Sequence, residues 1–171
     1  MKKVRSFSLI VLTLVLALLT AGCSQPAETP EGGEDGGETA GMGEWSIVIE
    51  VIGEEPIEFT QEDAKGIGPA EITAQQKDGD NVGEEQVWTG ILLEDLLEFV
   101  GVTEYSVISV ISADGFTREL DPARVSEGKT GIGWMVDGEL LTEEDGPIQF
   151  IADQRGPKWW VKQVAKIEVI K

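Results

Sequence analysis

The chain has 171 residues, with 32 acidic and 13 basic side chains, no histidine and a single cysteine, Cys23. A formal net charge of −19 excludes a nucleic-acid-binding surface, which needs clustered Lys and Arg to neutralise phosphates. Without histidine the chain lacks the most frequent general base and metal ligand. One thiol can form neither an intramolecular disulfide nor a cysteine-rich zinc site.

The start of the chain has the pattern of a secretory signal. Basic residues precede an apolar run over residues 7–19, and small residues follow up to Cys23. The run is shorter than the roughly 20 residues that a membrane-spanning helix needs, whereas its basic and small-residue flanks are typical of a signal peptide. The small residues ending in Cys23 resemble a bacterial lipoprotein signal, which implies that residues 1–22 are removed and that Cys23 carries the lipid. The alternative is an ordinary signal peptide with a cysteine just after the cleavage site.

Residues 24–44 differ in composition from the rest of the chain. They carry six acidic side chains and no basic one, among many Gly, Pro and Thr residues. Such a stretch lacks the apolar side chains that offset the entropy cost of ordering, so we expect residues 23–44 to form a lipidated, disordered acidic linker. A binding tail is the alternative. The folded domain is expected over residues 45–171, where 26 acidic and 10 basic side chains give a net charge of −16.

The first half of this domain predicts short strands. Over residues 45–51, apolar and polar side chains alternate with the period of two that is typical of a strand with one buried face. The next predicted elements are a strand at 57–59, a helical turn at 61–65 capped by Thr60, a strand at 70–76 and a turn at 78–83. This turn begins like a calcium-binding loop, but Val82 and Thr89 stand where that loop requires ligands. We therefore expect a plain turn.

The clearest helix is predicted over residues 92–100, and the segment 86–90 leads into it. Its leucines and Val100 form one apolar stripe, and Gly101 is placed to end it. The elements predicted after it are a strand at 105–112, the turn Asp114-Gly115 with a hairpin strand at 116–120, a short helix from Asp121-Pro122 to Gly128, a hairpin over 134–141, and strands at 146–152 and 166–170. Many short strands with one clear helix predict a β-rich α+β domain.

Several motifs lie in a fixed order along this domain. They are WTGILLEDLL at 88–97, SADGF at 112–116, DGELL at 137–141, GPIQFI at 146–151, KWWVK at 158–162 and KIEV at 166–169. In this order they resemble the molybdopterin-binding oxidoreductase domain of the sulfite oxidase family. The resemblance spans residues 71–170 and implies the single β-rich α+β domain of that family.

The matching positions do not carry the chemistry of that family. In the family, a cysteine thiolate near the position of Gln75 and Gln76 binds molybdenum, and Arg, Lys and His hold the pterin phosphate and the anionic substrate. An amide supplies neither the soft sulfur nor the charge of a thiolate, and the domain contains no Cys and no His. Its acidic surface also repels a phosphorylated cofactor. We therefore expect no cofactor, no metal site and no catalytic residue, and molybdopterin bound without a Cys ligand is the alternative.

Residues 154–162 form the one basic stretch of the acidic domain. If this segment is extended, Trp159 and Trp160 point to opposite faces, so one of them should line the surface or a cleft. A tryptophan flanked by cations can bind an anionic or planar ligand, although Lys and Arg stems also simply cover exposed indoles. The predicted ligand-binding residues are Arg155, Lys158, Trp159 and Lys162, with Gln75, Gln76, Trp88 and Asp114 nearer the pterin cleft of the family.

These observations predict a membrane-anchored, extracytoplasmic envelope lipoprotein that presents the domain as a ligand-binding or accessory module. The expected partners are the membrane, through the lipid anchor, and a small molecule or another envelope protein. The alternatives are a molybdopterin-dependent oxidoreductase that works without a Cys metal ligand and a purely structural surface protein.

Overall fold

The computed structural model describes residues 44–171, apart from residues 127 and 128. The predicted signal peptide, Cys23 and nearly all of the predicted linker lie outside the described residues. All described residues belong to one compact unit, Glu38–Lys171. No helix within this described part has the length and apolar character needed to cross a membrane.

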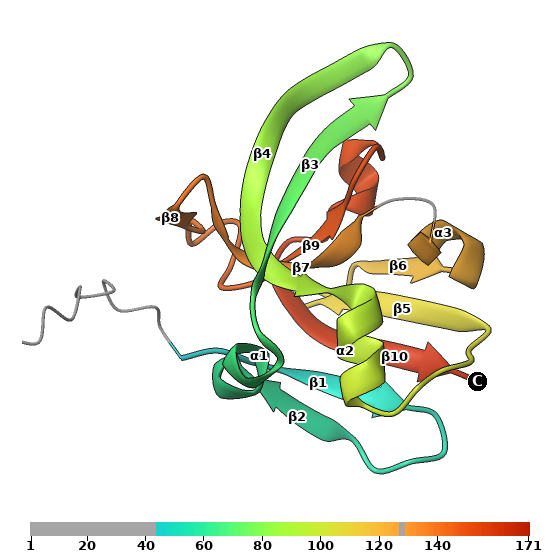
Figure 1. The fold of residues 1–171 in the computed structure, drawn as a ribbon. Coiled ribbons are helices and arrows are strands. Elements are labelled where there is room, and N and C mark those ends of the chain that lie inside the picture. The colour runs from blue at the N-terminus through green and yellow to red at the C-terminus, as the bar shows by residue number, and fades with distance from the viewer. Residues whose placement is uncertain (1–43, 127–128) are drawn as a thin grey trace, which may run out of the picture. The chain divides into compact units, whose positions relative to one another are not determined.

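A first five-stranded sheet has the strand order β2-β1-β10-β5-β6 (Figure 1). Its strands are β1 (Ser46–Val51), β2 (Ile57–Thr60), β5 (Val107–Ser112), β6 (Thr117–Leu120) and β10 (Val164–Ile170). The central pair, β1 and β10, is parallel, and every other neighbouring pair is antiparallel. The first and the last strand of the unit therefore lie side by side.

A second sheet has the order β3-β4-β7-β8, and β9 pairs with β7. Its strands are β3 (Ala70–Asp78), β4 (Asn81–Leu92), β7 (Thr130–Val136), β8 (Glu139–Leu140) and β9 (Gln149–Ala152). The helices are α1 (Gln61–Ile67), α2 (Leu93–Phe99), α3 (Pro122–Ser126) and the 3₁₀ helix η1 (Pro157–Trp159). Figure 1 shows the β3–β4 hairpin extending well beyond the ends of β7 and β9. The predicted β-rich α+β fold is confirmed.

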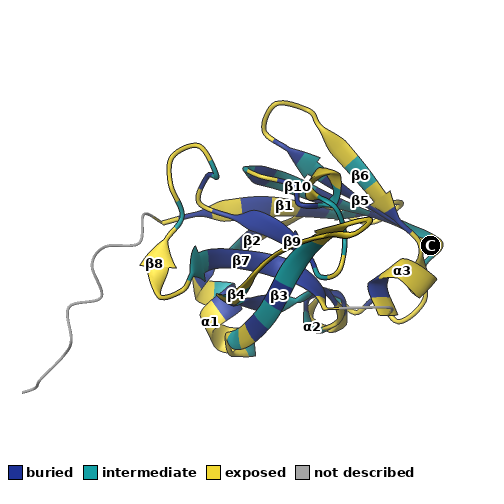
Figure 2. Ribbon diagram, turned by 90° about the horizontal axis from the view of Figure 1, so that it is seen from above, coloured by how far each residue is buried: buried dark blue, intermediate teal, exposed yellow. Residues whose placement is uncertain are grey.

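One hydrophobic core joins the two sheets. Its fully buried members come from strands of both sheets and include Ile47, Phe59, Ile108, Ile132, Phe150 and Ile167. Figure 2 shows buried residues on strands of both sheets, among them β1 and β10 of the first sheet and β7 and β9 of the second. The alternation predicted for β1 is present, since Ile47, Ile49 and Val51 are buried and the residues between them are not.

Local hydrogen bonds explain the start of α1. Thr60 Oγ1 accepts a 3.2 Å hydrogen bond from the Asp63 N–H, and the Asp63 carboxylate accepts one of 2.8 Å from the Thr60 N–H. This reciprocal cap satisfies backbone donors that the first turn of a helix leaves free. The hydrogen bond from the Thr60 side chain also lowers the pKa of Asp63. The predicted cap at Thr60 is confirmed.

Several element ends differ from those predicted. The turn predicted over 78–83 is only Gly79-Asp80, because β3 and β4 stay paired as far as Asp78 and Asn81. The helix predicted from residue 92 begins at Leu93, since Leu92 still pairs with β7. The strand over 130–133 was not predicted, because Gly131 and Gly133 remove the alternation of apolar side chains. The predicted end of the short helix at Gly128 lies outside the described residues.

Two glycines allow β4 and β7 to approach closely. A Cβ on Gly90 would lie against the carbonyl oxygen of Ile132, and a Cβ on Gly131 would lie against that of Ile91. Both contacts are with backbone, which cannot move aside as a flexible side chain can. The β4–β7 register shifts between Thr89 and Gly90, as at a β-bulge. The strand bend at this point therefore depends on the absence of side chains.

We expect Gly90→Ala to lower the free energy of unfolding by more than about 2 kcal/mol, because the added methyl group forces the two backbones apart. Gly66→Ala is the matched control, since a Cβ there meets nothing within 4 Å and the position is helical. The control should change stability by about 1 kcal/mol or less. Urea unfolding of both variants measures the difference, and equal effects would contradict this account of the bend.

Candidate functional site

Two guanidinium groups lie over the indole ring of Trp159. The Cζ atoms of Arg124 and Arg118 are 5.0 Å and 5.9 Å from the centre of this ring. The Arg118 Cζ also lies 4.5 Å from the ring centre of Phe116, which is 42% exposed. We call Phe116, Arg118, Arg124, Lys158 and Trp159 the Trp159 cluster. It places cations and aromatic faces together on the surface of an acidic domain.

Backbone and side-chain contacts from three elements hold this cluster. Arg118, on β6, donates a hydrogen bond from Nε to the carbonyl oxygen of Lys158, the middle residue of η1. The Nε atom of Arg124, on α3, is 3.6 Å from the Oδ2 atom of Asp121. Lys158 is exposed, and neither Lys158 nor Arg118 forms an ion pair with a carboxylate of the described residues. Their charges are therefore available to an anion.

Asp114 shapes the turn that carries Phe116. Its carboxylate accepts hydrogen bonds from the Ser112 hydroxyl and, at 2.9 Å, from the Phe116 N–H. Both bonds lower the pKa of Asp114, and the bond from Ser112 has the larger effect. The predicted ligand residue Asp114 is thus engaged within its own turn and positions the aromatic ring beside Arg118.

Trp159 and Trp160 differ in exposure, as predicted, but for another reason. The segment is a 3₁₀ turn and not an extended strand, with the Trp160 N–H donating to the Pro157 carbonyl oxygen at 3.1 Å. Trp160 is 5% exposed, whereas Trp159 is only partly buried against the core. The turn therefore leaves one indole available at the surface.

The structure places Trp88 in the core, although it was predicted to line a cleft. Its side chain is 3% exposed, and its ring centre is 5.7 Å from that of Trp160. The indole N–H groups of both residues are buried and have no hydrogen-bond partner among the described residues. Neither ring reaches the surface in this arrangement, so Trp88 acts in packing.

Gln75, Gln76 and Arg155 come together through backbone pairing at the end of β3. The Gln154 N–H donates to the Gln75 carbonyl oxygen, and the Lys77 N–H donates to that of Arg155, both at 2.9 Å. Gln76 and Arg155 form an isolated parallel bridge. The Gln75 N–H donates to the Asp153 carboxylate at 2.9 Å. The segment after β9 is thereby fixed against β3.

The donor set at this position does not fit a molybdenum centre. The family resemblance puts a thiolate near Gln75 and Gln76, but both side chains are amides and the domain has no thiol or imidazole. Within the described residues, no group of three or more His, Cys, Asp or Glu side chains is arranged to hold a metal ion. An amide oxygen is a hard, neutral donor and does not replace a soft anionic sulfur.

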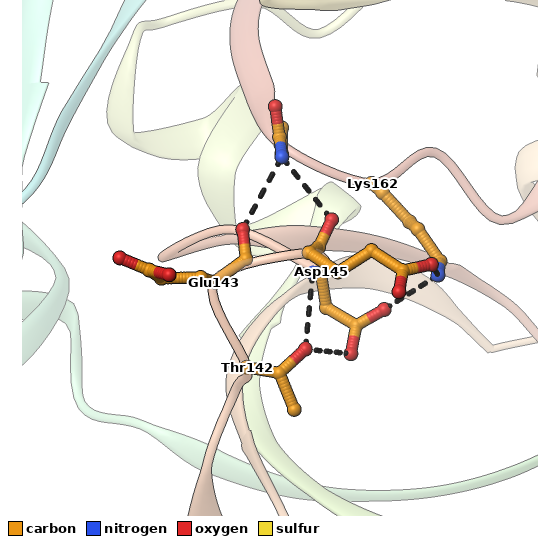
Figure 3. Close-up of polar contacts among 6 residues, drawn as sticks. Thr142, Glu143, Asp145 and Lys162 are labelled. Carbon is orange, nitrogen blue, oxygen red and sulfur yellow. Dashed lines mark hydrogen bonds and ion pairs between the residues drawn. The ribbon is translucent and has the colours of Figure 1, made fainter.

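Lys162 lies in a separate polar cluster, shown in Figure 3, and does not join the Trp159 cluster. Its Nζ is 2.7 Å from the Asp145 carboxylate and 3.0 Å from that of Glu144. The Thr142 hydroxyl donates a 2.6 Å hydrogen bond to Asp145. The hydrogen bond from Lys162 lowers the pKa of Asp145, and the bond from Thr142 lowers it further. The hydrogen bonds to Asp145 and Glu144 in turn raise the pKa of Lys162. Lys162 thus anchors the loop after β8.

Three members of the Trp159 cluster, Phe116, Arg118 and Arg124, were not among the predicted site residues. Phe116 directly precedes β6 and lies two residues before Arg118, which is the spacing at which side chains of a strand share one face. This spacing is the feature of the sequence that could have indicated that Phe116 and Arg118 lie together. Arg124 meets Trp159 only through the tertiary fold, and no local pattern indicates it.

We expect Asp145→Asn to lower the free energy of unfolding at pH 7 and to have less effect as the pH falls. A lowered pKa means that the ionised carboxylate stabilises the folded state above its unfolded pKa of about 3.9, and this contribution is lost as the pH falls through the folded value. For a partly exposed ion pair we expect at most about 1 kcal/mol. Urea unfolding between pH 7 and about pH 3 measures the effect.

Asp80→Asn, at the exposed β3–β4 turn, is the control and should not lower stability at pH 7. An Asp145→Asn deficit of the same size at both ends of this pH range would show that the carboxylate charge is not the stabilising feature.

Comparisons with known proteins agree with this fold. The family model described as the oxidoreductase molybdopterin binding domain matches residues 37–171. Among solved structures, the chain is similar to the sulfane dehydrogenase SoxCD from Paracoccus pantotrophus, with a TM-score of 0.63 at 20% sequence identity. The similarity covers 74% of this chain and 38% of that chain, so this protein spans well under half of it. No curated protein matches the sequence. The chain belongs to the family of oxidoreductase molybdopterin-binding domains.

Proposed function

We propose that this chain is a membrane-anchored envelope lipoprotein whose molybdopterin-oxidoreductase-type domain works as a ligand-binding or accessory module. The Trp159 cluster is the observation that carries this proposal. The motif ending at Cys23 supports the lipid anchor, and the acidic stretch after it would hold the domain away from an anionic membrane surface.

The ligand of the cluster is an anion, or an anionic surface of a partner protein, with a planar part. Guanidinium groups are weakly hydrated and stack on aromatic rings, so they bind flat anions well. Arg118 lies against both Phe116 and Trp159, which fixes the orientation of its planar group. Lys158, which is exposed and precedes Trp159 in the chain, adds a flexible positive charge. These cations would attract an anion, whereas the acidic surface of the rest of the domain repels it.

The domain does not itself coordinate molybdenum in this proposal, because it has no thiolate or imidazole at the expected position. Molybdopterin bound without a Cys ligand is the second candidate function. It is favoured by the family match and by Arg155, which lies beside Gln76 and near the start of η1 in the chain. In this second case basic residues would hold the pterin phosphate, and the metal would take its remaining ligands from elsewhere.

Elemental analysis of the full chain, purified in detergent from its native host, distinguishes the two candidates. We expect molybdenum far below a stoichiometric amount, since the chain offers the metal no soft anionic donor. A molybdenum enzyme purified from the same cells is the control for metal supply. Stoichiometric molybdenum in this chain would favour the second candidate and contradict the first.

Fluorescence quenching tests the cluster directly. Trp159 is the most exposed of the five tryptophans, since the other four are at most 6% exposed, so the emission that is lost in Trp159→Phe reports on a soluble quencher at the cluster. We expect iodide to quench more strongly than caesium, although the chain is acidic, because the guanidinium groups attract anions locally. Trp159→Phe should remove most of the quenchable emission.

Arg118→Met should reduce quenching by iodide and increase quenching by caesium. Lys65→Met removes the same charge from an exposed position on α1 and is the matched control, which should leave both unchanged. If Arg118→Met and Lys65→Met change the quenching by iodide and by caesium equally, anion binding at this cluster is refuted.

A further inference from the structure

A pocket of about 320 Å³ lies where the chain enters β1 and the loop after β8 passes beside it. Its inner wall contains the indoles of Trp45 and Trp134, whose ring centres are 5.4 Å apart. Aliphatic side chains of the β8 region and the following loop complete the wall. The remaining lining residues are Glu44, Leu140, Leu141, Thr142, Glu143, Gly146 and Pro147. We call this cavity the Trp45–Trp134 pocket.

The loop that forms the outer wall of the pocket is rigidly held. The polar cluster of Figure 3 clamps it, since Lys162 pairs with Glu144 and Asp145 while the Gln163 side-chain amide donates to the carbonyl oxygens of Glu143 and Glu144 at 3.3 Å and 3.1 Å. The Gln163 N–H also donates to the Asp145 carbonyl oxygen at 2.9 Å. The pocket is therefore preformed, which spares a ligand the entropy cost of ordering its wall.

The charged residues that line the pocket are acidic. Glu44 and Glu143 are exposed at its edge, and their carboxylates form no ion pair within the described part of the chain. No basic residue is among the described residues that line it. The neighbouring Glu144 and Asp145, in contrast, are already neutralised by Lys162. The cavity thus combines two indoles and apolar walls with two unpaired negative charges.

We propose that the Trp45–Trp134 pocket binds a small organic cation, with a quaternary or alkylated ammonium group as the recognised chemistry. Such a cation is weakly hydrated, so it enters an apolar cavity at low desolvation cost and is attracted by aromatic rings. The carboxylates of Glu44 and Glu143 add long-range attraction at the entrance. A hydrated metal ion does not fit this lining, because it needs several oxygen ligands and the inner wall is apolar.

Calorimetric titration of the full chain in an uncharged detergent tests this proposal with choline as the probe. Its neutral isostere 3,3-dimethylbutan-1-ol has the same shape with carbon in place of nitrogen. We expect choline to bind with a Kd of about 1 mM or tighter and at least about fivefold more tightly than the isostere. The double variant Glu44→Gln/Glu143→Gln should weaken choline binding by about fivefold or more.

The matched control is Glu84→Gln/Glu85→Gln, which removes the same two charges from exposed positions on the β3–β4 hairpin. It should change the Kd for choline by less than about twofold, because charges outside the pocket are screened by salt. All four positions are exposed, so these variants keep the core intact. No binding of choline, equal binding of the isostere, or equal losses in both double variants would each overturn the proposal.

Discussion

Backbone hydrogen bonds along the segment between β9 and β10 hold both candidate sites in place. At its start, Gln154 and Arg155 pair with the end of β3. At its end, Gln163 bonds to the loop after β8 through its N–H and to Ala113 in the β5–β6 turn through its carbonyl oxygen. Between these points lie η1, which carries Trp159, and Lys162, which clamps the pocket loop. One short segment without strand structure thus fixes the relative positions of β3, the loop after β8 and the β5–β6 turn.

The family scaffold is present, and the position where the family resemblance expects a thiolate holds Gln75 and Gln76. The backbone bridge that places Gln76 beside Arg155 is present although this position holds an amide and not a thiolate. Packing explains how the fold forms without a thiolate at this position, because its core consists of aliphatic and aromatic side chains from both sheets. A metal ligand at the end of β3 contributes nothing to that core. The same scaffold can therefore carry a surface site built from Arg118 and Trp159 on other elements.

Sequence reasoning succeeded where neighbouring residues decide the outcome. Alternation fixes the buried face of β1, and the Thr60 cap depends on Asp63 three residues later. It was less successful where distant segments meet. The length of the β3–β4 hairpin depends on pairing that outweighs weak local strand preference, and the partners of Lys162 lie in a loop some twenty residues earlier. Trp88 opens one of the motifs that resemble the family, but only its packing against Trp160 in the structure shows that it is buried.

The parallel pairing of β1 with β10 has a consequence for how the chain folds. Without β10, the first sheet consists of two separate hairpins, β1–β2 and β5–β6, and an isolated two-stranded hairpin is barely stable in water. Loop closure between such distant strands also slows folding. The first sheet can therefore form only once residues 164–170 are available to pair with β1 and β5, so its assembly waits for the last strand described.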